Sequence, residues 1–502
     1  MSQSLSEKTA AAETYSFTEK VESTSIASSL EKGTVQNEAT FVKSPEEVKL
    51  VRKINRIFMP LVGLALFIQF MDKSTLGYAG IMGIYEDTGI SHNQFAWLGS
   101  VFYVGYLVVQ IPNQYCLQRL PISKYLGTIF VVWGISLALT ALAHNFAQLA
   151  GLRFLLGFFE GTTYPAMFLL IATMYRRSEQ IVWYSFMFMC NALCGAFGGL
   201  VAYGVAYMHG LKGMSSWKWQ FIIWGCLTVV AGVLYFFFLA DKPKSRWFFL
   251  TPEEEKIVDA RTKDNASVQN KDIKKEHIYE ALREPRLYCY FLMSLFLNLQ
   301  NGAVTLFSQQ ITQQMGFSQL NTILMGIPHG AATIVLLVGS SFFSRRFDEL
   351  AYVGMIFSAI SMVAVILLAA IPPGPAQLAG LLISATTPLY TLMQASISNN
   401  VSGYTKKIFY TSANLVAYCI GNFIGPLMMD ESTGPRYIPG NAGYAVADFL
   451  CILLFGYIRW AYIRENKRRA QLLQEGSIPP PPKNREELDL TDKEDLYFVY
   501  KP

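Results

Sequence analysis

The sequence predicts an all-α membrane protein with twelve transmembrane helices in two six-helix bundles and with both termini in the cytoplasm. Of the 502 residues, 52% are hydrophobic and only 15% are charged. A soluble protein of this composition could not cover its own surface with polar groups. The apolar residues are gathered in twelve long runs, and basic residues fall in every second loop between these runs. The composition therefore predicts a membrane protein, the apolar runs predict its transmembrane helices, and the basic loops predict the orientation of these helices in the membrane.

Each apolar run is long enough to cross the hydrocarbon core as a helix, which takes about 20 residues. The expected helices are 57–84, 93–115, 122–143, 147–174, 181–208, 219–240, 287–312, 319–343, 351–371, 376–399, 408–429 and 443–463. Only helices and closed barrels satisfy the backbone hydrogen bonds in lipid, and these runs are far too long for barrel strands. We therefore expect helices for all twelve spans.

Lysine and arginine accumulate in the short cytoplasmic loops of membrane proteins. Basic residues precede the first expected helix, follow the last one, and occupy every second loop: Lys49, Arg52, Lys53, Arg56, Arg119, Lys124, Arg176, Arg177, Arg345, Arg346, Lys406, Lys407, Arg464, Lys467, Arg468 and Arg469. The alternate loops contain almost none, with Lys212, Lys218 and Arg436 as exceptions. Both termini are therefore expected in the cytoplasm, which requires an even number of helices.

A polar segment separates the first six expected helices from the last six. Within it, Thr251 is placed as an N-cap, Pro252 as the first helical residue and Glu254 as the partner in a capping box, so a short cytoplasmic helix is predicted. The expected parts are a disordered cytoplasmic tail (1–47), a six-helix bundle (48–240), a cytoplasmic linker (241–285), a second six-helix bundle (286–464) and a second disordered cytoplasmic tail (465–502). The loop 118–127 resembles the loop 344–354, as expected of parallel repeats.

Two adjacent charges, Asp72 and Lys73, lie inside the first expected helix. A charge at that depth costs roughly 2.5 to 3.5 kcal/mol, so it is expected to face a protein interior or a water-filled cavity and to mark a transport path. Neighbouring residues on a helix point about 100° apart, so the two side chains should have different partners. The alternative is an ion pair with a purely structural role.

The fourth expected helix contains Arg153 and Glu160, which lie about two turns apart on nearly the same face. Counting the helical rise from opposite membrane surfaces places Arg153 at about the same depth as Asp72. We therefore expect that these two side chains could form an ion pair.

The second half carries polar stripes in place of charges. They recur with helical spacing on three expected helices: Asn298, Asn301, Thr305 and Gln309; Thr391, Gln394 and Ser398; Asn414, Tyr418 and Asn422. Three such stripes facing one space would line a hydrated cavity. The alternative is hydrogen bonding between helices, which is worth about 0.6 kcal/mol per contact.

Several short motifs add to these charges and stripes: Met71–Ala79, Gly105–Pro112, Leu117–Pro121, Leu152–Glu160 with Pro165, Tyr175–Gln180, Trp217–Trp219, Leu250–Glu255 and Gly434–Tyr437. With them, residues 50–465 resemble the major facilitator superfamily and, within it, the fungal allantoate permease group of anion:cation symporters. The resemblance implies uptake of a small organic anion, such as a vitamin acid or a ureide, with a proton by alternating access. Arg153 or Lys73 would attract the anion, and Asp72 or Glu160 would respond to the proton.

We expect a monomer, and we expect it in the plasma membrane as the default location for nutrient uptake, with an internal membrane as the alternative. The fifth expected helix lacks the Gly-Pro signature of proton antiporters, because Gly195–Gly199 contains no proline, and this favours import. An exporter of a fungal metabolite and a nutrient receptor without transport remain alternatives. No catalytic triad, metal-ligand spacing or phosphate loop is found in the sequence, so we expect neither an enzyme nor a cofactor, metal or nucleic-acid partner.

Overall fold

The computed structural model describes residues 44–266, 273–384, 386–475 and 489–502. The expected tail 1–47 lies outside the described residues up to residue 43. Its last residues already belong to the first helix, because Ser44 caps this helix by accepting a hydrogen bond from the Glu47 amide at 3.1 Å. Over the described residues the chain forms helices joined by short connections.

All twelve expected spans are helical where the structure describes them. The first six are α2 (Pro45–Ala79), α4 (His92–Arg119), α5 (Ile122–Leu139), α6 (Phe146–Glu160) with α7 (Thr163–Met174), α8 (Arg177–Ala206) and α9 (Ser216–Phe238). The last six are α12 (Pro285–Gln314), α13 (Gln319–Leu324) with α14 (Gly326–Phe347), α15 (Leu350–Ala370), α16 (Leu378–Leu382) with α17 (Thr386–Asn400), α18 (Tyr404–Leu427) and α19 (Ile438–Gln474). Among the described residues, nine of these spans meet a strict length and hydropathy criterion for crossing a membrane.

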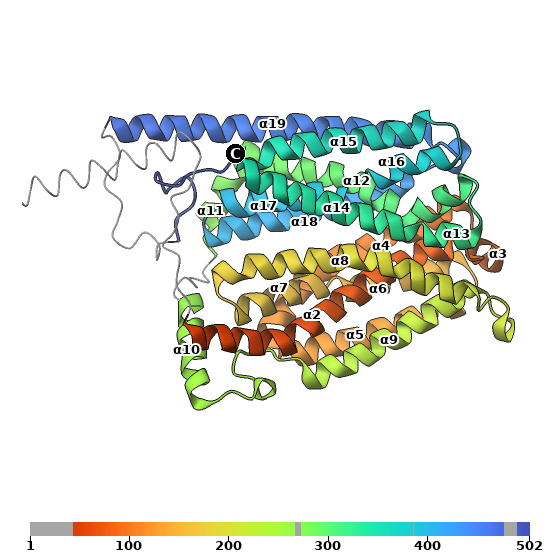
Figure 1. Ribbon diagram of the computed structural model, residues 1–502, viewed down its shortest axis with the longest axis horizontal. Coiled ribbons are helices and arrows are strands. Elements are labelled where there is room, and N and C mark those ends of the chain that lie inside the picture. Colours follow the sequence, from red (N-terminus) through yellow and green to blue (C-terminus); the bar gives the residue numbers. More distant parts are fainter. Residues whose placement is uncertain (1–43, 267–272, 385, 476–488) are drawn as a thin grey trace, which may run out of the picture.

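The helices form two bundles that lie one above the other in Figure 1, with α2 to α9 below and α12 to α19 above. In the first bundle α5 packs against α9, α4 against α6 and α2 against α8. In the second bundle the corresponding helices pair in the same way, α15 with α19, α14 with α17 and α12 with α18. The three helix pairs of the first half thus recur in the second half, as the similarity of the two basic loops predicts. The halves meet through α4 with α18, α8 with α14, and α2 with α12.

Glycines allow the closest of these helix contacts. A Cβ atom on Gly157 of α6 would clash with the carbonyl oxygen of Phe102 on α4. A Cβ atom on Gly425 of α18 would clash in the same way with the carbonyl oxygen of Leu299 on α12. Small residues let membrane helices approach until their backbones touch, and these two contacts are examples of that packing.

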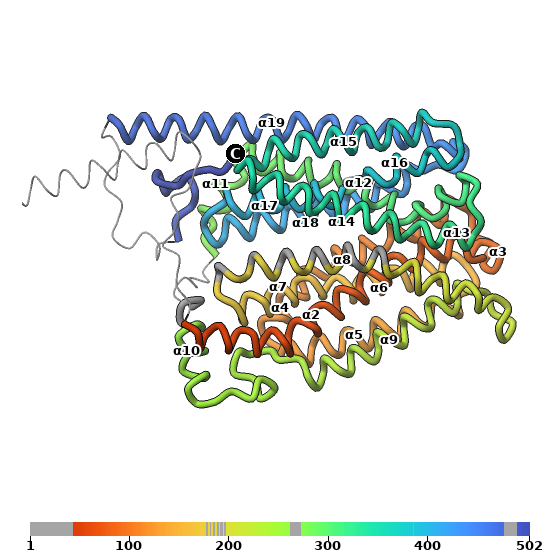
Figure 2. The backbone as a smooth tube through the Cα atoms, in the orientation of Figure 1, coloured from red at the N-terminus to blue at the C-terminus, as the bar shows by residue number. Residues whose placement is uncertain are grey.

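The linker carries α10 (Pro252–Ala266) and α11 (Lys275–Leu282), and each binds to its own bundle. The predicted capping box of α10 is present: the Thr251 amide donates to Glu254 Oε2 at 2.9 Å, and the Glu254 amide donates to Thr251 Oγ1 at 3.3 Å. Arg261 on α10 pairs with Glu47 at the start of α2 and, at 2.6 Å, with Glu179 of α8. Figure 2 shows α10 beside the first turns of α2.

The tail expected to be disordered over 465–502 is ordered where the structure describes it, and residues 476–488 of this tail lie outside the described residues. Helix α19 continues to Gln474, and residues 489–502 fold against the cytoplasmic end of the second bundle. Tyr500 is buried and stacks on Tyr462, with ring centroids 4.9 Å apart. The segment is held by distant partners, and local composition contains no information about these.

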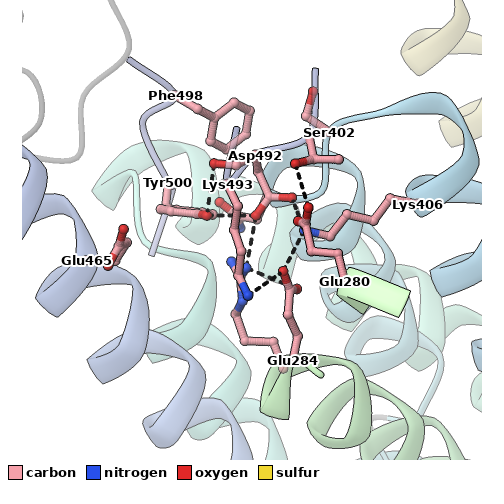
Figure 3. A network of polar contacts seen from close by, with 12 residues as sticks. Glu280, Glu284, Ser402, Lys406, Glu465, Asp492, Lys493, Phe498 and Tyr500 are labelled. Atoms are coloured by element: carbon pink, nitrogen blue, oxygen red, sulfur yellow. Dashed lines mark hydrogen bonds and ion pairs between the residues drawn. The ribbon is translucent and has the colours of Figure 1, made fainter. Parts of the chain in front are cut away.

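A network of charges at this end centres on Lys406, whose side chain is fully buried (Figure 3). Lys406 Nζ lies 2.7 Å from Glu280, 2.6 Å from Glu284 and 2.6 Å from Asp492. The three carboxylates lie close enough together to hold a metal ion, but the lysine ammonium already supplies the positive charge at their centre. The network therefore joins α11, α18 and the C-terminal segment.

Candidate functional site

Four charged side chains of the first bundle lie inside the membrane-spanning region. Lys73 Nζ on α2 lies 3.2 Å from Glu160 Oε1 on α6, and the Glu160 side chain is fully buried. Its neighbour Asp72 uses Oδ2 to accept a hydrogen bond from Trp133 Nε1 at 2.6 Å. The adjacent charges thus have different partners, as their 100° separation predicts.

A break in the fourth span places Glu160 at the end of a helix. Helix α6 ends at Glu160, and α7 starts at Thr163. At the break the Thr162 amide donates to the Phe159 carbonyl, and the Gly161 carbonyl accepts a hydrogen bond from Gln110 Nε2 at 3.2 Å. Irregular backbone at membrane depth is tolerated where protein or a water-filled cavity surrounds it.

Arg153, on the same helix, is buried near the charges of Asp72 and Glu160 but forms no ion pair with a described residue. Its side chain lies under the Phe221 ring at 5.3 Å, and the residue is only 3% exposed. Its Nε and Nη2 atoms have no hydrogen-bond partner among the described residues. The expected ion pair with Asp72 is not formed within 4.0 Å in this conformation, since Asp72 is bound by Trp133 instead. Arg153 therefore presents unused donors inside the protein.

A cavity of about 40 Å³ lies where the two bundles meet, next to these charges. It has room for roughly three water molecules. Both halves contribute to its lining: Lys73, Leu76, Leu98, Gly99, Phe102, Tyr103 and Arg153 from the first, and Gly302, Thr305, Leu306 and Pro426 from the second. The two cations of the cavity, Lys73 and Arg153, both come from the first bundle.

Aromatic side chains continue the site toward the second bundle. Tyr418 of α18 lies 6.0 Å from Tyr103 and 5.7 Å from Tyr390, measured between ring centroids. Lys73 Nζ lies 5.7 Å from the centroid of Tyr106, within the range of a cation–π contact. The sequence reasoning found Tyr418 but missed these partners, together with Phe102 and Trp133. Among these residues, Tyr103 and Tyr106 lie about one helical turn apart, and this spacing could have indicated that the two rings share one face.

The polar stripes of the second half have mixed roles. Asn422 Nδ2 donates to Asn298 Oδ1, and Asn301 Nδ2 donates to Asn422 Oδ1, both at 3.0 Å, so these three residues tie α12 to α18. Thr305, on the same stripe, does line the cavity. Each of these residues was expected to line a path, and in this conformation the asparagines serve the alternative, helix packing.

The remaining two predicted residues lie away from the cavity lining. Gln394 Nε2 donates to the hydroxyl of Tyr390 at 3.0 Å. The amide group of Asn414 is buried, and neither of its atoms has a partner among the described residues. The Asn414 amide could therefore form hydrogen bonds in another conformation.

Contacts between the halves gather at the end opposite the termini. Ser100 Oγ donates to the Phe423 carbonyl at 2.7 Å, and Gln319 Nε2 donates to the Ile81 carbonyl at 2.7 Å. The ring of His92 stacks on Phe307 with centroids 4.7 Å apart. With both termini in the cytoplasm, these contacts close the cavity on its extracellular side.

Comparisons with known proteins agree with this architecture. Residues 62–426 match the family model of the Major Facilitator Superfamily. An uncharacterized transporter of Schizosaccharomyces pombe is 37% identical over 460 residues, covering 90% of this chain and 89% of the relative. The allantoate permease of Saccharomyces cerevisiae is 33% identical over 473 residues, covering 91% and 87%. Among solved structures, a D-xylose–proton symporter superposes with a TM-score of 0.62 at 13% identity, covering 81% of this chain and 97% of that one.

Proposed function

Because the chain belongs to the Major Facilitator Superfamily, and so is an integral membrane transporter and not an enzyme, we propose that it imports a small organic anion with protons. The observation that carries this proposal is Arg153, a buried cation with two unused donors beside a cavity shared by both halves. The plasma membrane is the expected location for such an importer.

An anion is the ligand that suits Arg153 best. Buried guanidinium donors without acceptors are costly, and a carboxylate supplies two acceptors in the geometry of the guanidinium fork together with a negative charge. Lys73, on the same cavity, adds a second positive charge. The name of the Saccharomyces cerevisiae relative, allantoate permease, also indicates an organic acid.

The ion pair between Lys73 and Glu160 offers a way to couple the anion to a proton. A substrate carboxylate that binds Lys73 competes with Glu160 for the ammonium group. Glu160 would then be a buried carboxylate without its counter-charge, and such a group takes up a proton. Anion and proton would therefore load together, each favouring the binding of the other.

Alternating access would require the contacts that close the extracellular end between the two halves to break and form again. Contacts such as Ser100 with Phe423 and Gln319 with Ile81 close the extracellular end, so they must break when the cavity opens outward. The cavity stays between the halves in both states, as in transporters built from parallel repeats.

The test is uptake by the purified protein in proteoliposomes with an acidic exterior. We expect accumulation of a carboxylate such as allantoate above its external concentration, and no accumulation of a neutral amide of the same shape. Accumulation also separates a transporter from a receptor, and reversing the pH gradient separates import from export. Equal uptake of the acid and its amide would contradict the anion proposal.

A further inference from the structure

Helix α19 carries a single exposed stripe whose chemistry changes along the helix. Residues at successive three- or four-residue steps lie on this stripe and run from apolar through aromatic to basic: Val446, Phe449, Leu453, Tyr457, Trp460, Arg464 and Lys467. Such spacing places all of them on one face. Leu453 is 53% exposed and Trp460 54% exposed, although the helix packs its other face into the bundle.

The basic end of this stripe forms one wall of a groove. The opposite wall is the start of α15, with Tyr352 and Met355, and the groove has a volume of about 940 Å³. Helices α15 and α19 lie along the outer edge of the second bundle, and α19 projects beyond the bundle at the end where the termini lie (Figure 1). The groove therefore opens on the lipid-facing side at the cytoplasmic surface.

Two of the four cations in this groove form no ion pair with any described residue. Arg459 is held by both oxygens of Glu349 at 2.7 and 3.0 Å, and Arg468 pairs with Glu465 at 2.7 Å. Arg464 lies over the ring of Trp460 at 5.1 Å, and no ion pair is found for Arg464 or Lys467 in the part of the chain that the structure describes. The groove thus has an excess of positive charge.

The opposite face of the same helical turns is fixed. Arg469 donates to the backbone carbonyls of Asp492 and Phe498 at 2.8 Å each, so the C-terminal segment is bound to this face. The projecting part of α19 therefore presents Arg464 and Lys467 from a supported position.

We propose that this groove binds the headgroup of an anionic phospholipid from the cytoplasmic leaflet. The phosphate would lie between Arg464 and Lys467, and an acyl chain would run along Leu453 and Ile356, which is 58% exposed on α15. From Arg464 to Leu453 the helix rises about 16 Å, close to the roughly 15 Å thickness of one hydrocarbon leaflet. Trp460 lies between the basic and apolar parts, at the level that tryptophan prefers in membranes. A small soluble anion would make no contact with the apolar half of this stripe.

The test compares lipid binding by the purified protein and an Arg464→Gln/Lys467→Gln variant. The melting temperature in detergent is followed as dioleoyl phosphatidylserine is added. We expect saturable stabilisation of the parent and an apparent affinity about five-fold lower for each cation removed. Phosphatidylcholine should give no saturable stabilisation. Neither substituted side chain has a hydrogen bond or ion pair to lose among the described residues, and the contact of Arg464 with the Trp460 ring is exposed, so the melting temperature without lipid should change little.

The matched control is Arg52→Gln/Arg56→Gln, which removes two exposed cations from the same cytoplasmic side of the other bundle. This control should keep the affinity of the parent. Equal losses in both variants would show attraction by net charge alone and would overturn the site. Equal stabilisation by inorganic phosphate or glycerophosphoserine would also overturn the proposal, because neither molecule has acyl chains.

Discussion

Asp492 Oδ1 lies 2.6 Å from Lys406 Nζ, so a carboxylate near the C-terminus neutralises a fully buried cation at the start of α18. The two residues are 86 positions apart. Tyr500 also donates its hydroxyl to Asp492 Oδ2 at 2.7 Å, and the backbone of Lys501 exchanges hydrogen bonds with the Asn400 side chain. The C-terminal segment is therefore a structural part of the second bundle.

The substitution Asp492→Asn should weaken the docking of this segment. It keeps the shape of the side chain but removes one charge from a buried pair, a change that costs about 3 kcal/mol or more where no other partner remains. Glu280 and Glu284 still neutralise Lys406, so we expect a smaller loss, about 1 to 3 kcal/mol. Hydrogen–deuterium exchange of residues 491–502 measures it. The control Lys493→Gln removes a half-exposed ion pair with Glu284 and should change exchange little.

Docking of the same segment should depend on pH only under acidic conditions. Burial alone would raise the pKa of the Asp492 carboxyl, but the charges of Arg286 and Lys406 together hold this pKa below its usual value. The same three causes act on Glu284 and also lower its pKa. A lowered pKa in the folded state contributes stability above the unfolded pKa of about 4, and this stability is lost as pH falls through the folded value. The protection of the segment, corrected for the pH dependence of intrinsic amide exchange, should thus be constant from pH 8 to about pH 5. Release of the segment between pH 7 and 5 would contradict this.

How much the sequence could predict depends on the range of the interaction. The spans and the buried charges follow from the local content of apolar and charged residues, because insertion into lipid is decided over one helix length. The partner of Asp72 does not follow from local content. Counting the helical rise gives the depth of the Asp72 side chain in the membrane but not the direction in which it points around the helix. Arg153 was expected at the right depth, yet Trp133 of α5 is the residue that meets Asp72.

The C-terminal segment illustrates the same limit. Residues 465–502 are polar and include four consecutive prolines, a composition typical of a disordered linker. The structure nevertheless buries Asp492 and Tyr500, because Lys406, Arg286 and Tyr462 of the bundle offer partners for them. Long-range pairing of this kind leaves no periodic pattern in one sequence.

The substitution Glu160→Gln should separate coupling from binding. Glutamine keeps the size of the side chain but cannot exchange a proton, so accumulation driven by a pH gradient should be lost. Exchange of internal for external substrate should remain, since it needs no net proton movement. Uptake and exchange in proteoliposomes measure the two activities. Asp72→Asn is the comparison, because Asp72 accepts a hydrogen bond from Trp133 and forms no ion pair with a lysine among the described residues. If only Asp72→Asn abolished accumulation, the coupling proton would belong to Asp72.

The substitution Gly157→Ala should lower activity by moving the site. The added methyl group clashes with the Phe102 carbonyl, and overpacking of this kind costs about 1 to 3 kcal/mol. It should push α6 away from α4 and shift Arg153 and Glu160 relative to Lys73. Gly151→Ala is a matched control on the same helix, because nothing lies within 4 Å of a Cβ atom there. Thermal stability and uptake should fall for Gly157→Ala alone, and equal behaviour of the two variants would show that this contact tolerates a methyl group.

The substitution Arg153→Lys should weaken substrate binding while leaving the fold and membrane insertion intact. Lysine keeps the positive charge but not the planar fork that holds both oxygens of a carboxylate. Losing one charge-assisted hydrogen bond costs about 1.5 to 3 kcal/mol, which raises KM roughly 10- to 100-fold. Arg436→Lys is the control, because Arg436 donates to the backbone carbonyls of Ala369 and Ala370 and does not line the cavity. Initial uptake rates over a range of substrate concentrations give both KM values. An unchanged KM in Arg153→Lys, together with a raised KM in Lys73→Gln, would assign recognition of the anion to Lys73 instead.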